Sequence, residues 1–471
     1  MLEQSTFSLK NLWGIKPEFR RKVFYLALTF LFMLACQVMW RPLKMAIFSK
    51  MVGAYQIPNA KLFSLLYVIP LILLYSKLVD WLRRHQLVYC FTLFHAIGGL
   101  IFAYFMAHPV YGIANTTVSS SRYVGWAFYF FMESFDAFVS MTFWSFADSI
   151  NKPSDAKNYY GFLVAGSKIG GMLSAGIFYI ALSYSTIANQ LFLIPGSLVL
   201  GSLMLGAAAF SIYKLMNTVS DDYMHGYEAA YKLEKAKVRE KKSFWQIITS
   251  PLDGLFIMIK NPYVLGIFSM VFFYEMLIAV LDWWLALSAD KNMSTVAEMT
   301  AYFTLSYFFL NLIGFVVSLL GTTPILRLIG IRPALFLFPI VCLSLLFIAY
   351  CIPSTTILFI LILCLRSINY AFNHPTREIL YIPTTKDIKF KAKTWTDAFG
   401  SRIAKSAGSG FNIAIKGFSQ SAAFLSSLGL GVGLSFLWII IVYFLGRKFQ
   451  HAIDNKQVIG QKEEDDASSQ N

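Results

Sequence analysis

The residues best suited to do chemistry in this chain are charged side chains that lie inside long apolar stretches. Arg41 and Lys44 close the first stretch, and their separation of three residues places both on one helix face if the helix continues. Glu133 lies deep in the fourth stretch, among aromatic neighbours. A charge at the bilayer centre costs about 2.5–3.5 kcal/mol on insertion scales, so each residue is a candidate for function. The alternatives are that Arg41 and Lys44 extend to the outer interface and that Glu133 forms a purely structural ion pair.

Two carboxylates lie in the seventh apolar stretch. Glu275 and Asp282 are seven residues apart, close to two helical turns, so a helix presents them on the same face. This spacing predicts that one or both line an internal cavity. Because Trp283 and Trp284 follow Asp282, a place in the aromatic belt at the membrane interface is the alternative for that residue.

Further cations begin or enter apolar stretches in both parts of the chain: Lys168, Arg366, Arg402 and Lys405. Lys168 lies in the sequence GSKIG at 166–170, and Arg402 lies in the similar GSRIA at 400–404. Phosphate groups explain such converging cations, since Arg binds a phosphate through two hydrogen bonds and Lys acts as a point charge. A cytosolic loop charge is the alternative for Lys405.

The composition excludes an ordinary soluble enzyme. The chain is 57% hydrophobic and 14% charged, whereas soluble domains are about 25% charged. Its net charge of +15 comes from Lys and Arg in short loops, which indicates membrane topology and not nucleic acid binding. The sequence has no G-x-x-x-x-G-K-[ST] loop, metal-spaced His or Cys pair, or nucleophile constellation. We therefore expect no cofactor and no metal, and a nucleotide would be cargo and not fuel.

Twelve segments are candidates to cross a bilayer, which takes roughly 20 apolar residues in a helix. They are 23–40, 60–80, 86–107, 124–147, 161–184, 190–213, 263–288, 300–320, 333–352, 354–374, 396–417 and 424–446. If both termini are cytoplasmic, the cations gather in the inner loops, and the outer loops 185–189 and 353–355 have none. The positive-inside rule therefore predicts twelve spans with both ends in the cytosol. Residues 1–22 lack a cleavable signal and do not resemble a plastid transit peptide, which favours a bacterial inner membrane.

The predicted domain organisation has two membrane halves. The segments are a cytoplasmic N-terminus (1–22), a six-helix half (23–213), a basic cytoplasmic linker (214–262), a second six-helix half (263–446) and a cytoplasmic tail (447–471). Lys168 and Arg402, 234 residues apart, lie at equivalent spans on either side of the linker. This pattern predicts an all-α polytopic membrane protein that is major-facilitator-like, with the substrate site between the halves near the midplane.

Residues 369–383, NYAFNHPTREILYIP, resemble a family signature that reads approximately K-Y-S-L-F-D-P-T-K-E-M-A-Y-I-P. It belongs to the ATP/ADP translocases of obligate intracellular bacteria and plastids, the nucleotide transporter family. Further matches to that family are Arg41 and Lys44 in its R-D-T-K, Glu133 at its fourth-span glutamate, FWSFA at 143–147, KFKAK at 389–393 and GSRIAKS at 400–406. The resemblance covers essentially the whole membrane part, and it implies a carrier that exchanges nucleotides.

That family has four charged positions associated with transport, a Lys in the first span, a Glu in the fourth, a Glu in the seventh and a Lys near the tenth. Lys44 and Glu133 match the first two, and Asp282 aligns with the third as a conservative change. The tenth-span lysine falls on Asn369, and the signature aspartate falls on His374. Arg366 lies one helical turn before Asn369, so it is placed to replace the missing cation.

The leading hypothesis is ATP/ADP antiport by alternating access through a cationic central site. It assigns positive charge for the phosphates to five residues: Lys44, Lys168, Arg366, Arg377 and Arg402. Glu133 and Asp282 would pair with these cations in the empty carrier. We expect the nucleotide and the lipid bilayer as partners, no nucleic acid, and a monomer.

Two alternatives stay open. Asn369, His374 and the additional Glu275 motivate a proton-coupled importer of another nucleotide or phosphorylated or anionic metabolite, because histidine titrates near neutrality. The more remote alternative is a polytopic membrane enzyme that modifies lipid headgroups.

Overall fold

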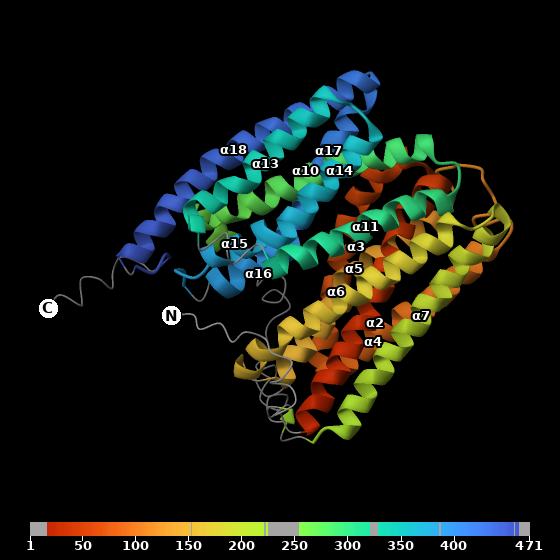
Figure 1. Ribbon diagram of the computed structural model, residues 1–471, viewed down its shortest axis with the longest axis horizontal. Coiled ribbons are helices and arrows are strands. Elements are labelled where there is room, and N and C mark those ends of the chain that lie inside the picture. Colours follow the sequence, from red (N-terminus) through yellow and green to blue (C-terminus); the bar gives the residue numbers. More distant parts are fainter. Residues whose placement is uncertain are drawn as a thin grey trace. The chain divides into compact units, whose positions relative to one another are not determined.

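The computed structural model describes residues 17–151, 153–220, 223–224, 254–320, 328–385, 388–455 and 457–460. Within these ranges the chain is helical apart from turns, loops and one isolated β-bridge between Thr384 and Ile459 (Figure 1). The predicted all-α class is therefore confirmed. Most of the predicted linker, the first sixteen residues and residues 461–471 lie outside the described residues.

The first six α-helices of the described residues overlap the first six predicted spans. They are α2 (Pro17–Phe48), α3 (Ile57–Trp81), α4 (Arg84–Ala107), α5 (Tyr123–Ile150), α6 (Pro153–Ser183) and α7 (Ile187–Thr218). The helix α2 continues through Pro42 to Phe48, beyond residue 40, where the first span is predicted to end. A π-helix, η1 (Ser49–Gly53), and a 3₁₀ turn, η2 (Ala54–Gln56), then lead into α3. Arg41 and Lys44 thus lie on one continuous helix.

The remaining helices are more broken. They are α10 (Pro262–Asn292), α11 (Val296–Leu320), α13 (Ile331–Cys351), α14 (Thr355–Ile368), α15 (His374–Leu380), α16 (Lys393–Trp395), α17 (Ser401–Ala414) and α18 (Gln420–Asp454). Three π-helical segments interrupt this part, η4 (Asn369–Asn373), η5 (Ile388–Ala392) and η6 (Thr396–Gly400), and a 3₁₀ turn, η7 (Ile415–Gly417), follows α17. The helix predicted at 354–374 is formed by α14, η4 and α15, and it therefore continues to Leu380. Such π-segments are frequent at functional sites.

Seven helical segments of the described part are long and apolar enough to cross a membrane. They are Pro17–Ile72, Arg84–Ala107, Ala188–Thr218, Pro262–Asn292, Val296–Val316, Ile331–Cys351 and Gln420–Asp454. These segments indicate a multi-pass membrane protein. The count of twelve spans stays a prediction.

The helices pack as two compact units. The first contains α2, α4 to α7, α3 from Leu66 onward and Ala289–Leu312. The second contains residues 57–65 at the start of α3, α10 up to Ser288, and the chain from Ile313 onward.

In the first unit, α2 packs against α5, α6 and α7, and α4 packs against α5 and α7. Trp40 of α2 is fully buried, and its indole N–H donates to the carbonyl of Ser197 at 3.1 Å. A Cβ at Gly99 or Gly201 would lie 2.4 or 2.2 Å from the indole ring. Only glycine therefore allows α4 and α7 to approach this ring so closely. The packing holds α2 in position at Trp40, the residue before Arg41.

A buried lysine also holds the start of α2. Lys22 is 1% exposed, although it lies at the end of the predicted cytoplasmic N-terminus, where a lysine is expected to be in water. Its Nζ donates to the carbonyls of Ile150 and Tyr223, both at 2.6 Å. The ammonium group thus pairs with a carbonyl at the end of α5 and with one beyond α7.

In the second unit, α13 packs against α14 and α18. Residues of α10 contact Leu380, Ser427 and Gly408. The Tyr263 hydroxyl donates to the carbonyl of Leu380 at 2.7 Å, and the Trp284 N–H donates to Ser427 Oγ at 2.8 Å. A Cβ at Gly408 of α17 would lie 2.6 Å from the backbone oxygen of Met276. The backbones of α17 and α10 are therefore in direct contact at this glycine.

Candidate transport site

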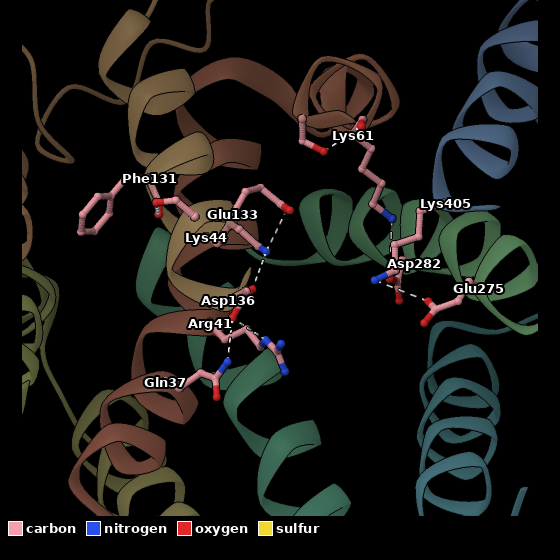
Figure 2. A network of polar contacts seen from close by, with 12 residues as sticks. Gln37, Arg41, Lys44, Lys61, Phe131, Glu133, Asp136, Glu275, Asp282 and Lys405 are labelled. Carbon is pink, nitrogen blue, oxygen red and sulfur yellow. Dashed lines mark hydrogen bonds and ion pairs between the residues drawn. The ribbon is translucent and has the colours of Figure 1, made fainter. Parts of the chain in front are cut away.

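Lys44 of α2 lies between two carboxylates of α5 in the first unit. Its Nζ is 3.0 Å from Glu133 Oε1 and 3.0 Å from Asp136 Oδ2 (Figure 2). The ammonium group also lies 5.6 Å from the centre of the Tyr129 ring. Glu133 and Asp136 are three residues apart, so one face of α5 presents both acids to the same cation.

Asp136 is the centre of this network. It accepts hydrogen bonds from Gln37 Nε2 at 3.0 Å, from Arg41 Nε at 3.1 Å and from Lys44 at 3.0 Å. Its side chain is 14% exposed. Two cations thus face two carboxylates, and their formal charges balance. Figure 2 shows the donors of α2 converging on Asp136.

Two residues of α11 contact Arg41 and Lys168 of the first unit. The guanidinium of Arg41 lies 5.9 Å from the centre of the Tyr307 ring. Lys168 of α6 donates to Asn311 Oδ1 at 3.4 Å. Because Tyr307 and Asn311 are one turn apart, Arg41 and Lys168 meet the same face of α11. An aromatic ring and an amide oxygen thus hold these two cations close to the Asp136 network.

In the second unit, Asp282 of α10 faces two cations. Arg366 Nη2 of α14 donates to both carboxylate oxygens, at 2.7 and 2.9 Å. Lys61, in the second turn of α3, places Nζ 3.6 Å from Asp282 Oδ2. Trp283 and Trp284, which motivate the aromatic-belt alternative for Asp282, are both buried in the protein.

Glu275 has its own cation on the same helix face. Its Oε2 lies 3.5 Å from Lys405 Nζ of α17 (Figure 2). Lys405 therefore belongs to a helix and not to a loop, and it extends toward α10. The predicted shared face of Glu275 and Asp282 corresponds to two neighbouring acid–base contacts on α10.

The two positions that differ from the family signature have different surroundings. Asn369 is buried in η4, and its Oδ1 accepts from Asn373 Nδ2 at 2.8 Å. His374 is half exposed, with Nε2 3.9 Å from Glu378 Oε1. Asn369 is therefore engaged within its own π-helical turn, while His374 is open to solvent beside an acid.

Arg377 is buried in a second acid–base network of this unit. Its Nη2 lies 3.7 Å from Asp397 Oδ1 and 4.0 Å from Glu378 Oε1, and its Nε is buried without a hydrogen-bond partner among the described residues. Lys393 pairs with Glu378 and lies over the Tyr381 ring. Burial raises the pKa of Tyr381, so this phenol stays protonated. The network links α15 to the segment before α17.

Lys168 and Arg402 differ more than their matching sequences suggest. Lys168 lies well inside α6, which begins at Pro153, and not near the start of its helix. Arg402 is the second residue of α17 and is half buried, one turn before Lys405. The two cations thus occupy different places on their helices.

Sequence reasoning missed three members of these networks. Asp136 is one turn from Glu133, and that spacing is visible in the sequence. Gln37 is uncharged and one turn before Arg41, so nothing distinguishes it from packing residues. Lys61 lies near the start of a predicted span, where a lysine usually anchors the helix at the membrane interface. Its contact with Asp282, which the sequence does not show, places it in the network instead.

The profile of a family described as TLC ATP/ADP transporter matches residues 3–364 and 357–449. The chain belongs to this family. The family consists of transporters, so the chain is a membrane carrier and the lipid-modifying enzyme alternative is set aside.

Curated members with similar sequences are named ADP,ATP carrier protein 4. The protein from Rickettsia bellii is 23% identical over 490 residues, which cover 91% of this chain and 89% of that protein. The protein from Rickettsia felis is 22% identical over 507 residues, which cover 95% of each chain. The likeness therefore extends over nearly the full length of both relatives.

Solved structures of transporters share the fold. The peptide transporter POT has a TM-score of 0.57 at 14% identity, with 90% of this chain and 95% of that chain covered. The nucleoside transporter NupG has a TM-score of 0.56 at 14% identity, with coverage of 89% and 99%. A bacterial homologue of ferroportin has a TM-score of 0.56 at 16% identity, with coverage of 93% and 99%. These likenesses confirm the predicted major-facilitator-like fold.

Proposed function

We propose that this carrier exchanges nucleotides, with ATP against ADP as the pair, and that its ion-paired cations bind the phosphates. The observation that carries the proposal is Lys44, which is held at 3.0 Å by both Glu133 and Asp136 inside a membrane carrier of an ATP/ADP transporter family. Charged residues inside membrane-spanning helices cost free energy of insertion, and they are retained where they serve transport.

The contacts of Lys44 explain how a phosphate can be admitted. Two carboxylates share one ammonium group, so an incoming phosphate replaces Glu133 while Asp136 continues to hold the lysine. Arg41 is the second cation of this network, and its side chain is 37% exposed. Glu133 and Asp136 thus neutralise the cations in the empty carrier and yield them to the substrate.

In the second unit, Arg366 has the corresponding role. Both hydrogen bonds to Asp282 come from Nη2, so the guanidinium can keep Asp282 as its partner and offer its other N–H groups to a phosphate. We assign Lys168, Arg377 and Arg402 as further cations for the phosphates, and Glu275 as the acid that holds Lys405. Asn369 and His374 mark where this chain differs from the family signature, and Arg366 supplies the charge that Asn369 lacks.

The proposal places the carrier in a bacterial inner membrane, as a monomer with both termini in the cytoplasm. Cations in the inner loops and their scarcity in loops 185–189 and 353–355 support this orientation. The domain boundaries proposed from the sequence, with a linker at 214–262, belong to the same proposal.

The test is uptake of labelled ATP into proteoliposomes preloaded with ADP, compared with empty vesicles. Wild-type protein should take up ATP only into preloaded vesicles. Lys44→Ala should reduce this uptake at least tenfold, because removing one partner of a buried charge pair costs roughly 2–5 kcal/mol. Lys214→Ala is the matched control, since Lys214 is exposed on α7 of the same unit.

Two outcomes would contradict this proposal. Uptake driven by a pH gradient without any counter-substrate would favour the proton-coupled importer, and His374→Asn would then be the first variant to measure. Equal uptake by Lys44→Ala and wild type would remove Lys44 from the site.

A further inference from the structure

The surroundings of Lys61 point to a role in substrate binding. Lys61 lies in α3, and its side chain is 14% exposed. Its Nζ is 3.6 Å from Asp282 Oδ2 and 3.4 Å from the carbonyl oxygen of Ala279. A lysine that serves as an interfacial anchor extends into water. Lys61 instead extends along α10 toward the acid that Arg366 also contacts (Figure 2).

The distances at Asp282 rank its two cations. Arg366 donates at 2.7 and 2.9 Å, within the usual range of charge-assisted hydrogen bonds. Lys61 stands at 3.6 Å from the carboxylate, beyond that range, and its bond to Ala279 is near the upper limit. Asp282 therefore binds Arg366 closely and Lys61 loosely, so one carboxylate charge is shared by two cations.

Neighbouring residues explain why a second cation is present here. Asn369 occupies the place of a lysine in the family signature, and its amide oxygen is used by Asn373 within η4. Arg366, one turn earlier, is closely bound to Asp282. Of the two cations at Asp282, Lys61 lies farther from the carboxylate and has the more flexible stem, so a substrate displaces its contact with Asp282 more readily.

We propose that Lys61 binds a phosphate of the transported nucleotide while Arg366 keeps Asp282 in place. The inference rests on the proposed function and extends its site by one residue. The phosphate takes over the ammonium group from Asp282 and Ala279, and Asp282 remains neutralised by Arg366. The ligand chemistry is that of an anionic phosphate, for which an ammonium group is a point-charge partner.

Two neutral variants and one conservative variant test this proposal. Lys61→Met and Lys61→Gln remove the charge but keep much of the side-chain volume, and Lys61→Arg keeps the charge. Lys77→Met is the matched control, because Lys77 is an exposed lysine of the same helix. Two quantities are measured: the ATP concentration for half-maximal exchange, and the rise in melting temperature caused by inorganic triphosphate on purified protein.

The neutral variants should raise the half-saturating ATP concentration at least tenfold and lose most of the triphosphate-induced rise in melting temperature. The half-saturating ATP concentration of Lys61→Arg should stay within about threefold of the wild-type value, because arginine keeps the positive charge. Lys77→Met should match wild type in both measurements. A purely structural lysine would instead lower the melting temperature of the ligand-free protein and leave the triphosphate effect unchanged, which would overturn the inference.

The two readouts separate this inference from the proposed function. If wild type exchanges ATP and Lys61→Met does so with unchanged half-saturation, Lys61 is not a phosphate ligand. If wild type binds triphosphate through Lys61 but exchanges no nucleotide, the proposed function fails, while Lys61 is still shown to bind phosphate. If wild type neither exchanges ATP nor responds to triphosphate, both proposals fail.

Discussion

At the scale of single residues, the two acids of α5 are not equivalent. Asp136 accepts from Gln37, Arg41 and Lys44, whereas Glu133 is in contact with Lys44 and its side chain is more exposed, at 24% against 14%. Asp136 thus holds the cations in place, and Glu133 is the acid that a substrate can displace.

Asp136→Asn should therefore be more harmful to stability than Glu133→Gln. Removing the Asp136 charge leaves Arg41 and Lys44 with one carboxylate, and breaking a buried pair costs about 3–5 kcal/mol. Glu133→Gln leaves Lys44 paired with Asp136 and should cost about 1 kcal/mol or less. Thermal unfolding of both purified variants measures the difference, and equal melting temperatures would contradict the ranking.

Much of the candidate site follows from one rule about charges in apolar sequence. That rule finds Arg41, Lys44, Glu133, Asp282 and Arg366, because a charge inside a span needs a reason to be there. It does not find partners. Lys44 and Glu133 are 89 residues apart and Arg366 and Asp282 are 84 apart, so only the packing of helices joins them.

At the scale of elements, the contact between α17 and α10 determines where Lys405 lies. Gly408 brings the two backbones together, and Lys405 reaches Glu275 from one turn earlier on α17. Apolar length predicts that helices occur near these positions. It does not predict the π-helical turns at 369–373 and 396–400, because those depend on how neighbouring helices accommodate an extra residue.

Gly408→Ala should destabilise the second unit, whereas Gly410→Ala should not. A Cβ at Gly408 meets the Met276 backbone oxygen at 2.6 Å, and overpacking of this kind costs about 1–3 kcal/mol. No heavy atom lies within 4 Å of a Cβ at Gly410, so alanine there should be neutral or gain up to about 1 kcal/mol of helix stability. Melting temperatures check the pair. An unchanged melting temperature for Gly408→Ala would mean that α17 and α10 can move apart without loss of stability.

At the scale of the whole molecule, the charge pattern of the loops predicts the orientation in the membrane. Single cysteines introduced by Ala188→Cys and Pro353→Cys, in a background without the five native cysteines, should react with a membrane-impermeant maleimide in intact cells. Asn455→Cys, exposed at the end of α18, should react only after permeabilisation. Labelling of the Asn455→Cys variant in intact cells would contradict the predicted cytoplasmic location of the C-terminus.

The contacts of Lys22 have a consequence for the order of events during synthesis. This residue is synthesised early, yet one carbonyl that its ammonium group binds belongs to Tyr223, 201 residues later. At translation rates of 5–20 residues per second, that carbonyl follows roughly 10–40 s behind. The contacts at the start of α2 are therefore completed only after α7 has been synthesised.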